Sequence, residues 1–387
     1  MARLDEIFNL QMGKTPSRNN TGYWIEGKYD WISIADLSTY SKYTGTTKER
    51  ISEVAVQESG IKRVPENTVI MSFKLSLGKT AITKESIYTN EAIMAFIPTG
   101  KYAVLPDYFY HLFSTMNWSK GTNRAVMGTT LNKATLGAIS IIVPPLSEQR
   151  KIAAVLDKVS DLITKHRQQL DKLDELVKSR FIEMFGEPEN NNKAWPVKSL
   201  DKLCTVGSSK RVYQSEQSSE GVPFWRISDL VSKIDTGTVD SALFISEIKY
   251  TELKRAGLVP VTGDILVTSR GTLGRCYIIQ DEDCFYFQDG MISWLSNYSE
   301  EITPLYLQYL FTMSGFRKQI DNTQAGSTVA YLSIAMLKKL QVMVPDKALQ
   351  EQFAAFVAQT DKSKLAIKQS LEKLETLKKS LMQQYFG

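Results

Sequence analysis

The chain has 387 residues, of which 43% are hydrophobic and 23% charged, and its formal net charge is +5. This length suggests two or three domains, and the mild positive charge is compatible with a polyanionic partner. The three cysteines (Cys204, Cys276 and Cys284) form no CxxC pair, which argues against a zinc site and favours a reducing compartment. The N-terminal stretch MARLDEIFNL is charged where a signal peptide would be apolar. No apolar run reaches the roughly 18 residues of a membrane span, so we expect none.

Residues 1–143 have the pattern of a mixed α/β unit with a predominantly β core. After a short helix or strand at 4–10, runs of apolar residues predict strands at 31–37, 68–73, 81–82, 92–97 and 139–143. Residues 106–116 predict a helix with one aromatic face, and Leu131 and Leu136 suggest a further short helix.

Residues 144–187 predict one long helix. Apolar residues recur there at steps of four and three, which is the heptad seam of a helix that lies along another: Ile152, Leu156, Val159, Ile163, Leu170, Leu173 and Val177. Ser147 can cap its start, and Gly186 followed by Pro188 is a typical stop. About 40 residues at about 1.5 Å each make a rod of roughly 60 Å, which needs a partner.

The partner is expected in residues 345–387, which align with the first rod without a gap at a shift of 201. Pro144 falls on Pro345 and Gln149 on Gln350, and the second seam includes Leu371 and Leu374. Thr360 and Lys364 interrupt that seam, and a polar seam position can fix the register of paired helices.

The repeat continues upstream, where residues 31–37, 67–79 and 105–113 match 224–230, 263–275 and 303–311. The whole chain is therefore expected to be a tandem duplication. Its parts are a globular unit at 1–143, a rod at 144–187, a linker at 188–194, a second globular unit at 195–344 and a second rod at 345–387.

Motifs for catalysis are missing from the sequence. The two histidines, His111 and His166, have no Cys or His at ligand spacing and are interpreted as structural. No glycine-rich phosphate-binding motif is present, and neither a methyltransferase tetrad nor a clustered nuclease carboxylate site can be found. We therefore expect a protein that catalyses nothing alone, with no metal and no cofactor of its own.

Basic and amide-bearing loops do occur, in equivalent places in both halves. Arg can read guanine, Asn or Gln can read adenine, and Lys mostly meets phosphate. The candidate DNA-binding residues are Lys14, Arg18, Lys74, Lys79, Asn123 and Arg124 in the first unit, and Lys210, Arg211, Arg270, Arg275, Arg317, Lys318, Asn322 and Gln324 in the second. For each residue taken singly, a plain turn with solvated basic ends explains the pattern as well.

The architecture resembles the specificity subunit of type I restriction–modification systems. The resemblance covers essentially the whole chain, and its strongest marks are the stretch PPLSEQRKIA at 144–153, the long rod ending in Phe185-Gly186-Glu187, and the repeat of unit and rod. One departure is that the second rod holds Leu349-Gln350-Glu351 where the first has Glu148-Gln149-Arg150.

The resemblance implies an α/β (α+β) fold with two target-recognition domains, each reading half of a bipartite site in double-stranded DNA. It implies two rods that pair antiparallel as a spacer, with the domains at opposite ends and related by a pseudo-twofold axis. The implied partners are modification subunits, which bind S-adenosylmethionine, and restriction subunits, in a prokaryotic cytoplasm. Two alternatives stay open: an interaction scaffold that binds proteins, and an enzyme with an unfamiliar site.

Overall fold

The computed structural model describes the chain except residues 75, 119–122, 126–127 and 324–329, and of residues 123–125 and 128–130 it describes the strands alone. The chain forms two compact units. Unit 1 comprises Met1–Arg167 with Lys368–Gly387, and unit 2 comprises Gln168–Ile367. Each unit therefore contains one globular domain together with a half of each long helix.

The main sheet of unit 1 has the order β2-β8-β5-β6, and all neighbouring strands are antiparallel. A second sheet, β4-β3-β7, pairs β3 with β7 in parallel, and two short pairs, β1-β11 and β9-β10, complete the strands. The strands are β1 (Ala2–Arg3), β2 (Phe8–Met12), β3 (Tyr29–Ile32), β4 (Glu49–Ile51), β5 (Val69–Ser72), β6 (Thr80–Ile82), β7 (Tyr88–Thr89), β8 (Ile93–Pro98), β9 (Asn123–Ala125), β10 (Gly128–Thr130) and β11 (Ser140–Ile141). The helices of this domain are α1 (Leu4–Ile7), η1 (Thr21–Tyr23), α2 (Ile34–Thr39), α3 (Glu53–Ser59), α4 (Pro106–Thr115) and α5 (Lys133–Gly137).

Unit 2 repeats this topology. Its main sheet has the order β13-β20-β17-β18, and its second sheet, β14-β16-β15-β19, again holds one parallel pair, β15 with β19. The strands are β12 (Val197–Ser199), β13 (Thr205–Gly207), β14 (Gln217–Ser218), β15 (Val222–Trp225), β16 (Phe244–Ile245), β17 (Ile265–Thr268), β18 (Cys276–Ile278), β19 (Tyr286–Phe287), β20 (Ile292–Ser296) and β21 (Gln341–Met343). The helices are η2 (Leu200–Lys202), η3 (Gln214–Glu216), α7 (Ile227–Thr236), α8 (Glu247–Arg255), α9 (Pro304–Leu310), α10 (Ser314–Asn322) and α11 (Ile334–Lys339). The matching strand orders confirm the duplicated α/β fold expected from the sequence.

Each core joins the main sheet, one helix and the rod. In unit 1, Phe8 packs edge-on against Phe96, Phe109 and Phe113, and Leu156 of the rod belongs to the same buried cluster. Unit 2 has a corresponding cluster, in which Phe181 stacks on Tyr306 and the other ring pairs meet edge-on; its four rings are Phe181, Phe185, Tyr306 and Phe353. Because aromatic rings bury large areas, these clusters fix each domain to its part of the rods.

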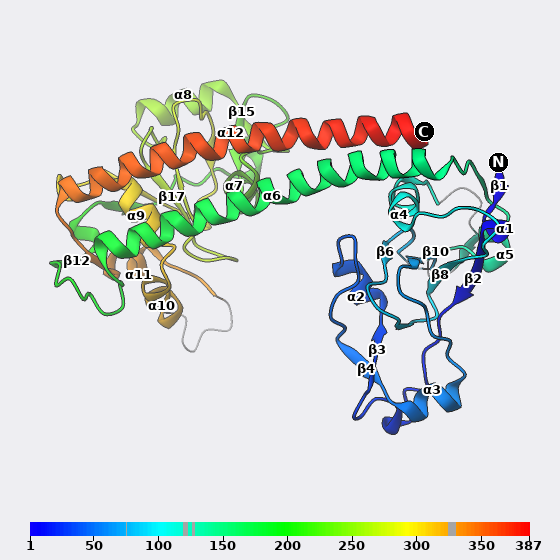
Figure 1. Cartoon of the computed structure of the whole chain (residues 1–387). Helices are drawn as coiled ribbons and strands as arrows, with labels where there is room; N and C mark the ends of the chain where they lie inside the picture. The colour runs from blue at the N-terminus through cyan, green and yellow to red at the C-terminus, as the bar shows by residue number, and fades with distance from the viewer. Residues whose placement is uncertain (75, 119–122, 126–127, 324–329) are drawn as a thin grey trace. The chain divides into compact units, whose positions relative to one another are not determined.

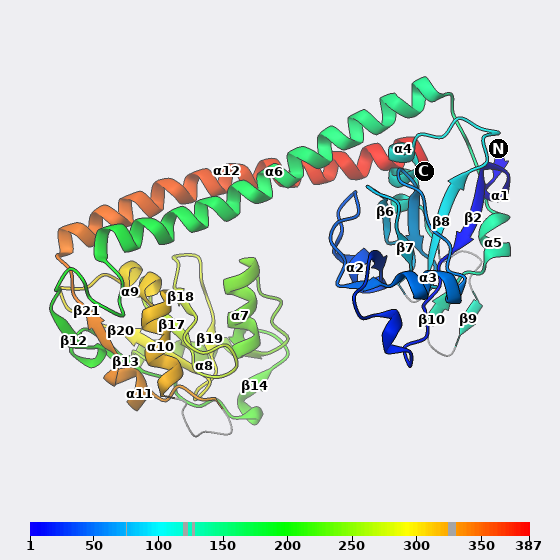
Figure 2. The same ribbon diagram turned by 60° about the horizontal axis from the view of Figure 1, so that its bottom comes forward.

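The two rods are the helices α6 (Leu146–Phe185) and α12 (Lys347–Phe386). Figures 1 and 2 show α6 in green beside α12 in orange and red. In unit 1 His166 bonds Ser370 at 2.9 Å and Arg167 bonds Glu375, whereas in unit 2 Lys364 pairs with Asp174. Later residues of α6 thus face earlier residues of α12, so the helices pair antiparallel.

Burial along the rods follows the heptad seam. Ile152, Leu156, Val159, Ile163 and Val177 are buried. Half-buried seam residues are Leu170, Leu173, Leu371 and Leu374. The polar seam residue Thr360 is also buried, and its hydroxyl donates to the Phe356 carbonyl at 2.9 Å. Both polar interruptions of the second seam are therefore hydrogen-bonded or ion-paired inside the helix pair.

Three local expectations need correction. The strand predicted at 31–37 ends at Ile32 and is followed by α2, because Ser33 and Asp36 form a reciprocal capping box that overrides the apolar pattern. Leu131 lies before α5, whose cap is Asn132. Helix α6 begins at Leu146, so Ser147 lies inside its first turn and is not the residue before it.

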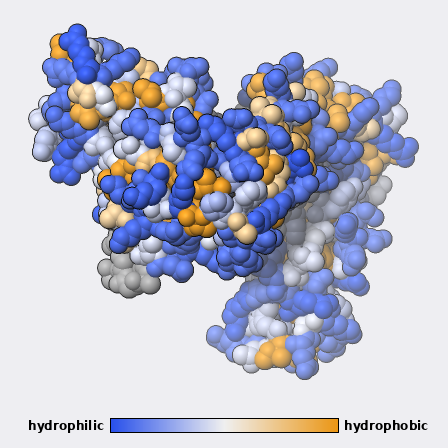
Figure 3. Space-filling model, turned by 90° about the vertical axis from the view of Figure 1, so that its left-hand side faces the viewer, coloured by the Kyte–Doolittle hydropathy of each residue, from blue (hydrophilic) through white to orange (hydrophobic). Residues whose placement is uncertain are grey.

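Among the described residues, none of the helices combines the length and the apolar character of a membrane span. On the face shown in Figure 3, hydrophobic residues form small groups separated by hydrophilic ones.

Candidate nucleic-acid interface

Several strand ends of unit 1 meet in one loop edge, made of Gly13-Lys14, Phe73-Lys74 and Asn90-Glu91. Backbone hydrogen bonds tie these loops together: Gly13 N to Ile93 O at 3.0 Å, Lys14 N to Thr89 O at 2.8 Å and Phe73 N to Ala92 O at 3.0 Å. Strands β2, β5 and β7 thus end beside the start of β8, and a folded scaffold positions the loop side chains.

Unit 2 has the same loop edge, made of 208–211, Ser269-Arg270 and Gln288-Asp289. Its backbone bonds repeat those of unit 1, since Ser269 N donates to Met291 O at 2.9 Å as Phe73 N does to Ala92 O. Gln288 N donates to Trp225 O at 2.9 Å, as Asn90 N does to Ile32 O. The two edges therefore share a backbone and differ in their side chains.

An Asn or Gln residue followed by an acidic residue lies at the centre of each edge. In unit 1 this pair is Asn90-Glu91, and Asn90 Nδ2 donates to Thr15 Oγ1 at 3.0 Å. In unit 2 it is Gln288-Asp289, and the Asp289 carboxylate accepts from Arg211 at 3.0 Å. Both amide side chains are half-buried. Neither Asn90 nor Gln288 was predicted from the sequence, although the alignment of YTNE at 88–91 with YFQD at 286–289 could have indicated them.

Basic side chains border both edges. In unit 1 Lys14 reaches the Ser59 carbonyl with its ammonium, and the Lys74 ammonium lies 5.2 Å from the Phe73 ring centre. In unit 2 the exposed Arg270 lies with its guanidinium 5.0 Å from the centre of the Tyr331 ring, and Lys210 N donates to Tyr286 Oη at 2.8 Å. Lysines thus dominate the first edge and arginines the second.

A hairpin turn behind each edge is held by one hydroxyl. In unit 1 Lys79 N donates to Ser72 Oγ at 3.0 Å, and that hydroxyl bonds the Ser76 carbonyl. In unit 2 Arg275 N donates to Thr268 Oγ1 at 2.9 Å, and that hydroxyl bonds the Thr272 carbonyl. The turn that carries Lys74 or Arg270 is therefore fixed in the same way twice.

Comparison with known proteins agrees with this duplicated architecture. The model of the type I restriction modification DNA specificity domain matches residues 1–175 and again 192–378. The chain belongs to the family of type I restriction–modification DNA specificity subunits.

Relatives match over nearly the whole length. The MjaIX specificity subunit of Methanocaldococcus jannaschii is 26% identical, with 92% of this chain and 85% of the relative covered. The MjaVIII specificity subunit of the same organism is 22% identical, with 99% and 90% covered. Among solved structures, the S subunit from M. genitalium aligns with a TM-score of 0.58 at 15% identity, covering 100% of this chain and 95% of that one. A chain from a study of the assembly and conformational transition of the type I system aligns with a TM-score of 0.61 at 16% identity, covering 100% and 96%. Both structures support the fold of this specificity subunit.

Several basic residues singled out from the sequence are engaged in contacts within the protein. Arg18 is stacked 3.8 Å above the Trp24 ring and is paired with Glu49. Arg275 is paired with Asp235, and the Arg275 guanidinium lowers the pKa of that carboxyl. Arg317 donates to the Leu273 carbonyl at 2.9 Å, and Lys318 pairs with Glu189 at 2.7 Å.

The remaining candidates are Asn123 and Arg124 in β9, Lys79 at the end of the first hairpin turn, and the exposed Asn322 at the end of α10. Gln324 lies outside the described residues. The structure thus brings together Lys14 and Lys74 in one unit, and Lys210, Arg211 and Arg270 in the other, and the other candidates are not among the residues that form the two edges.

The attachment of each domain to its rod uses one buried glutamine. Gln149 Oε1 accepts from Leu105 N at 2.9 Å, and its Nε2 donates to the carbonyls of Ala103 and Pro144. Gln350 does the same in unit 2, accepting from Thr303 N at 2.9 Å and donating to the Glu301 and Pro345 carbonyls. These glutamines aligned in the sequence, but their bonding role was not predicted.

Unit 1 adds an ionic cluster at this junction. Asp157 of α6 accepts from Lys42 at 2.7 Å and contacts His111 Nε2 at 2.8 Å, while Lys42 also pairs with Asp107. Burial raises the pKa of Asp157, but the hydrogen bonds from His111 and Lys42 outweigh burial, and the pKa is lowered. His111 and His166 both lie in packed, hydrogen-bonded positions.

Within the part of the chain that the structure describes, no group of three or more His, Cys, Asp or Glu could hold a metal ion.

Proposed function

We propose that this chain is the DNA-reading subunit of a type I restriction–modification complex and recognises a bipartite, asymmetric site. One observation carries the proposal: the same loop edge is built twice on the same backbone, with different side chains. Two half-sites of different sequence require two domains that share a backbone scaffold and differ in the side chains that contact the bases. Membership of the specificity-subunit family supports the same conclusion.

The side chains of each edge suggest how the bases are read. An Asn or Gln amide can bond the N6 and N7 positions of adenine, and Arg can bond O6 and N7 of guanine, both in paired geometry. Asn90 with Lys14 and Lys74 then suits an adenine flanked by phosphate contacts. Gln288 with Arg211 and Arg270 suits a half-site that also contains guanine.

The proposed partners are modification subunits, which supply S-adenosylmethionine and the methyl transfer, and restriction subunits. The chain itself catalyses nothing and works in the prokaryotic cytoplasm. The paired rods are proposed to set the length of the unread gap. Removing one heptad from both rods is expected to change that gap and leave both half-sites unchanged.

The proposal is tested by co-expressing the chain with its modification subunit and mapping methylated adenines across the host genome. We expect one motif with two unlike halves and a fixed gap. Asn90→Ala and Gln288→Ala are expected to relax one half each, by about 1–3 kcal/mol at the affected base. Asn9→Ala, at an exposed position of β2, is the matched control and should leave the motif unchanged. A stable complex that methylates no defined motif would refute the proposal and favour a protein-binding scaffold.

A further inference from the structure

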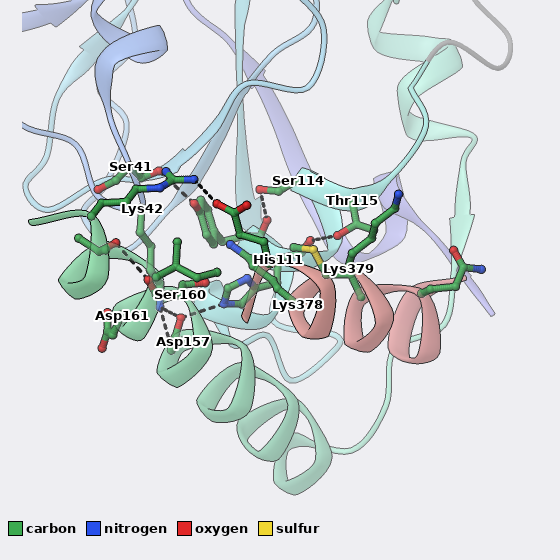
Figure 4. A pocket seen from close by; sticks show the side chains of 17 residues that line it. Ser41, Lys42, His111, Ser114, Thr115, Asp157, Ser160, Asp161, Lys378 and Lys379 are labelled. Carbon is green, nitrogen blue, oxygen red and sulfur yellow. Dashed lines mark hydrogen bonds and ion pairs between the residues drawn. The ribbon is translucent and has the colours of Figure 1, made fainter. Parts of the chain in front are cut away.

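A hollow of 790 Å³ opens in unit 1 between α4, α6 and the last turns of α12, with Ser41 and Lys42 at one side (Figure 4). Small-molecule sites typically measure about 300–1,000 Å³, so this hollow is of ligand size. It lies on the rod side of the domain and shares no residue with the loop edge of unit 1. The DNA-reading proposal does not use it.

Most charges in the wall are paired within the protein. Asp157 is bound by Lys42 and His111, and Glu375 is bound by Arg167 at 2.7 Å. The lining residues Lys378 and Lys379 of α12 have no carboxylate within salt-bridge distance among the described residues. The acid Asp161 also lines the hollow, and Figure 4 places it at the outer edge, away from Lys379. Lys378 and Lys379 are therefore the two cations of the wall without an ion-pair partner among the described residues.

Lys378 is held in an unfavourable place for an ammonium group. Burial lowers its pKa and the positive charge of Arg167 lowers it further, whereas the negative charge of Asp157 raises it. Lys378 is half-buried, and an ammonium group that loses part of its hydration is stabilised by an anionic partner. An anion bound between Arg167, Lys378 and Lys379 would be such a partner.

Buried polar atoms of the wall also lack partners. His111 is 1% exposed, and its Nδ1 has no hydrogen-bond partner although its Nε2 contacts Asp157. Ser160 Oγ, on the α6 side, is likewise buried without a partner. Figure 4 shows the His111 ring and Lys378 facing the same hollow. Buried polar atoms are normally hydrogen-bonded, so a bound polar group is one way in which these two atoms would be satisfied.

The sequence repeat provides an internal comparison. Under the alignments that define the duplication, Lys378 corresponds to Val177, His111 to Tyr309 and Asp157 to Ala358. Val177 is 1% exposed and packs in the apolar core of unit 2. The scaffold therefore folds with an apolar filling at this place, and the polar lining of unit 1 is not needed for the fold.

We propose that this hollow binds a phosphate group carried by a nucleotide-sized ligand. Arg167, Lys378 and Lys379 would hold the phosphate, since guanidinium and ammonium groups form strong charge-assisted hydrogen bonds with it. Tyr110, Ile163 and Met382 offer an apolar wall for a base. The phosphate could belong to a free nucleotide or to a nucleotide of a DNA strand, and the same groups would recognise both.

The test titrates the full-length chain with a fluorescent N-methylanthraniloyl derivative of AMP, with inorganic phosphate as competitor. Wild type should bind saturably and be displaced by phosphate. Lys378→Ala with Lys379→Ala should weaken binding at least about tenfold, the loss expected for one charge-assisted bond. Lys378→Val, which copies unit 2, should do the same without loss of fold. Lys362→Ala with Lys368→Ala, exposed on the same helix, is the matched control.

A second titration uses a DNA duplex that lacks the target motif. If the duplex alone loses affinity in the Lys378 and Lys379 variant, the phosphate is that of the DNA backbone, and the site stands. If neither AMP, inorganic phosphate nor the duplex responds to the variant, the site is refuted. The methylated motif of the co-expressed complex is read separately, so failure here leaves the DNA-reading proposal untouched.

Discussion

Gln350 is expected to be the strongest single link between the second domain and its rod. Its side chain is 1% exposed and forms bonds to Thr303 N at 2.9 Å, Glu301 O at 2.9 Å and Pro345 O at 2.8 Å. Gln350→Leu keeps the volume but removes the partner of the Thr303 amide and hydroxyl and of two carbonyls. Each such group costs about 1–3 kcal/mol when it stays away from water. Because some of these groups can regain water, we expect a loss of about 2–4 kcal/mol in the free energy of unfolding of unit 2.

Urea unfolding followed by tryptophan fluorescence measures the loss, and hydrogen exchange localises it to the Thr303 amide. Gln352→Leu, at an exposed position two residues further on α12, should cost less than about 0.5 kcal/mol. Gln149→Leu should destabilise unit 1 in the same way, with lost protection at Leu105. If Gln350→Leu matched the Gln352→Leu control, the glutamine would not be the link that the bonding pattern indicates.

Three further predictions concern other parts of the chain. The pKa of Asp157 is lowered in the folded state. The ionised carboxylate therefore stabilises the folded state fully above the unfolded pKa of 3.8, and this stabilisation is lost as the pH falls through the folded pKa. Melting curves of unit 1 below about pH 4 should show the loss, and Asp157→Asn should abolish this pH dependence. Cys284 is exposed, whereas burial raises the pKa of the Cys204 thiol to about 12 and also raises that of Cys276. A thiol reagent should therefore modify one cysteine in the native chain and three after denaturation. Gly274 has a φ of +71°, and an added Cβ would lie 2.6 Å from Ile320 Cδ1. Gly274→Ala should therefore lower the free energy of unfolding by at least about 1–2 kcal/mol, measured by denaturant unfolding. Gly237 also has a positive φ but has open space around it, so Gly237→Ala should cost less.

The parts of the fold that repeat along the sequence were predictable from it. The heptad seam predicted α6 and α12, and the gapless alignment of the rods predicted the duplicated domains. Residues 31–37 were misassigned because the side chains of Ser33 and Asp36 cap a helix there, and a capping box is decided by two side chains rather than by apolar periodicity.

The loop edges were predicted only in part. Charge pointed to Lys14 and Arg270, but it pointed equally to Arg18 and Arg317, whose contacts with Glu49 and the Leu273 carbonyl come from distant segments. Asn90 and Gln288 carry no charge, so the composition gave no reason to choose them. Their position at the strand ends, which the folded sheet makes apparent, distinguishes them from other amides, and in the sequence only the alignment of 88–91 with 286–289 could have indicated it.

The most direct test of the DNA-reading account replaces residues 1–143 with the first domain of a relative that has another target, and maps the methylated motif of the co-expressed complex. The account predicts that one half of the motif changes while the other half and the gap are retained. A motif in which both halves change, or neither does, would contradict the claim that each domain reads its own half-site.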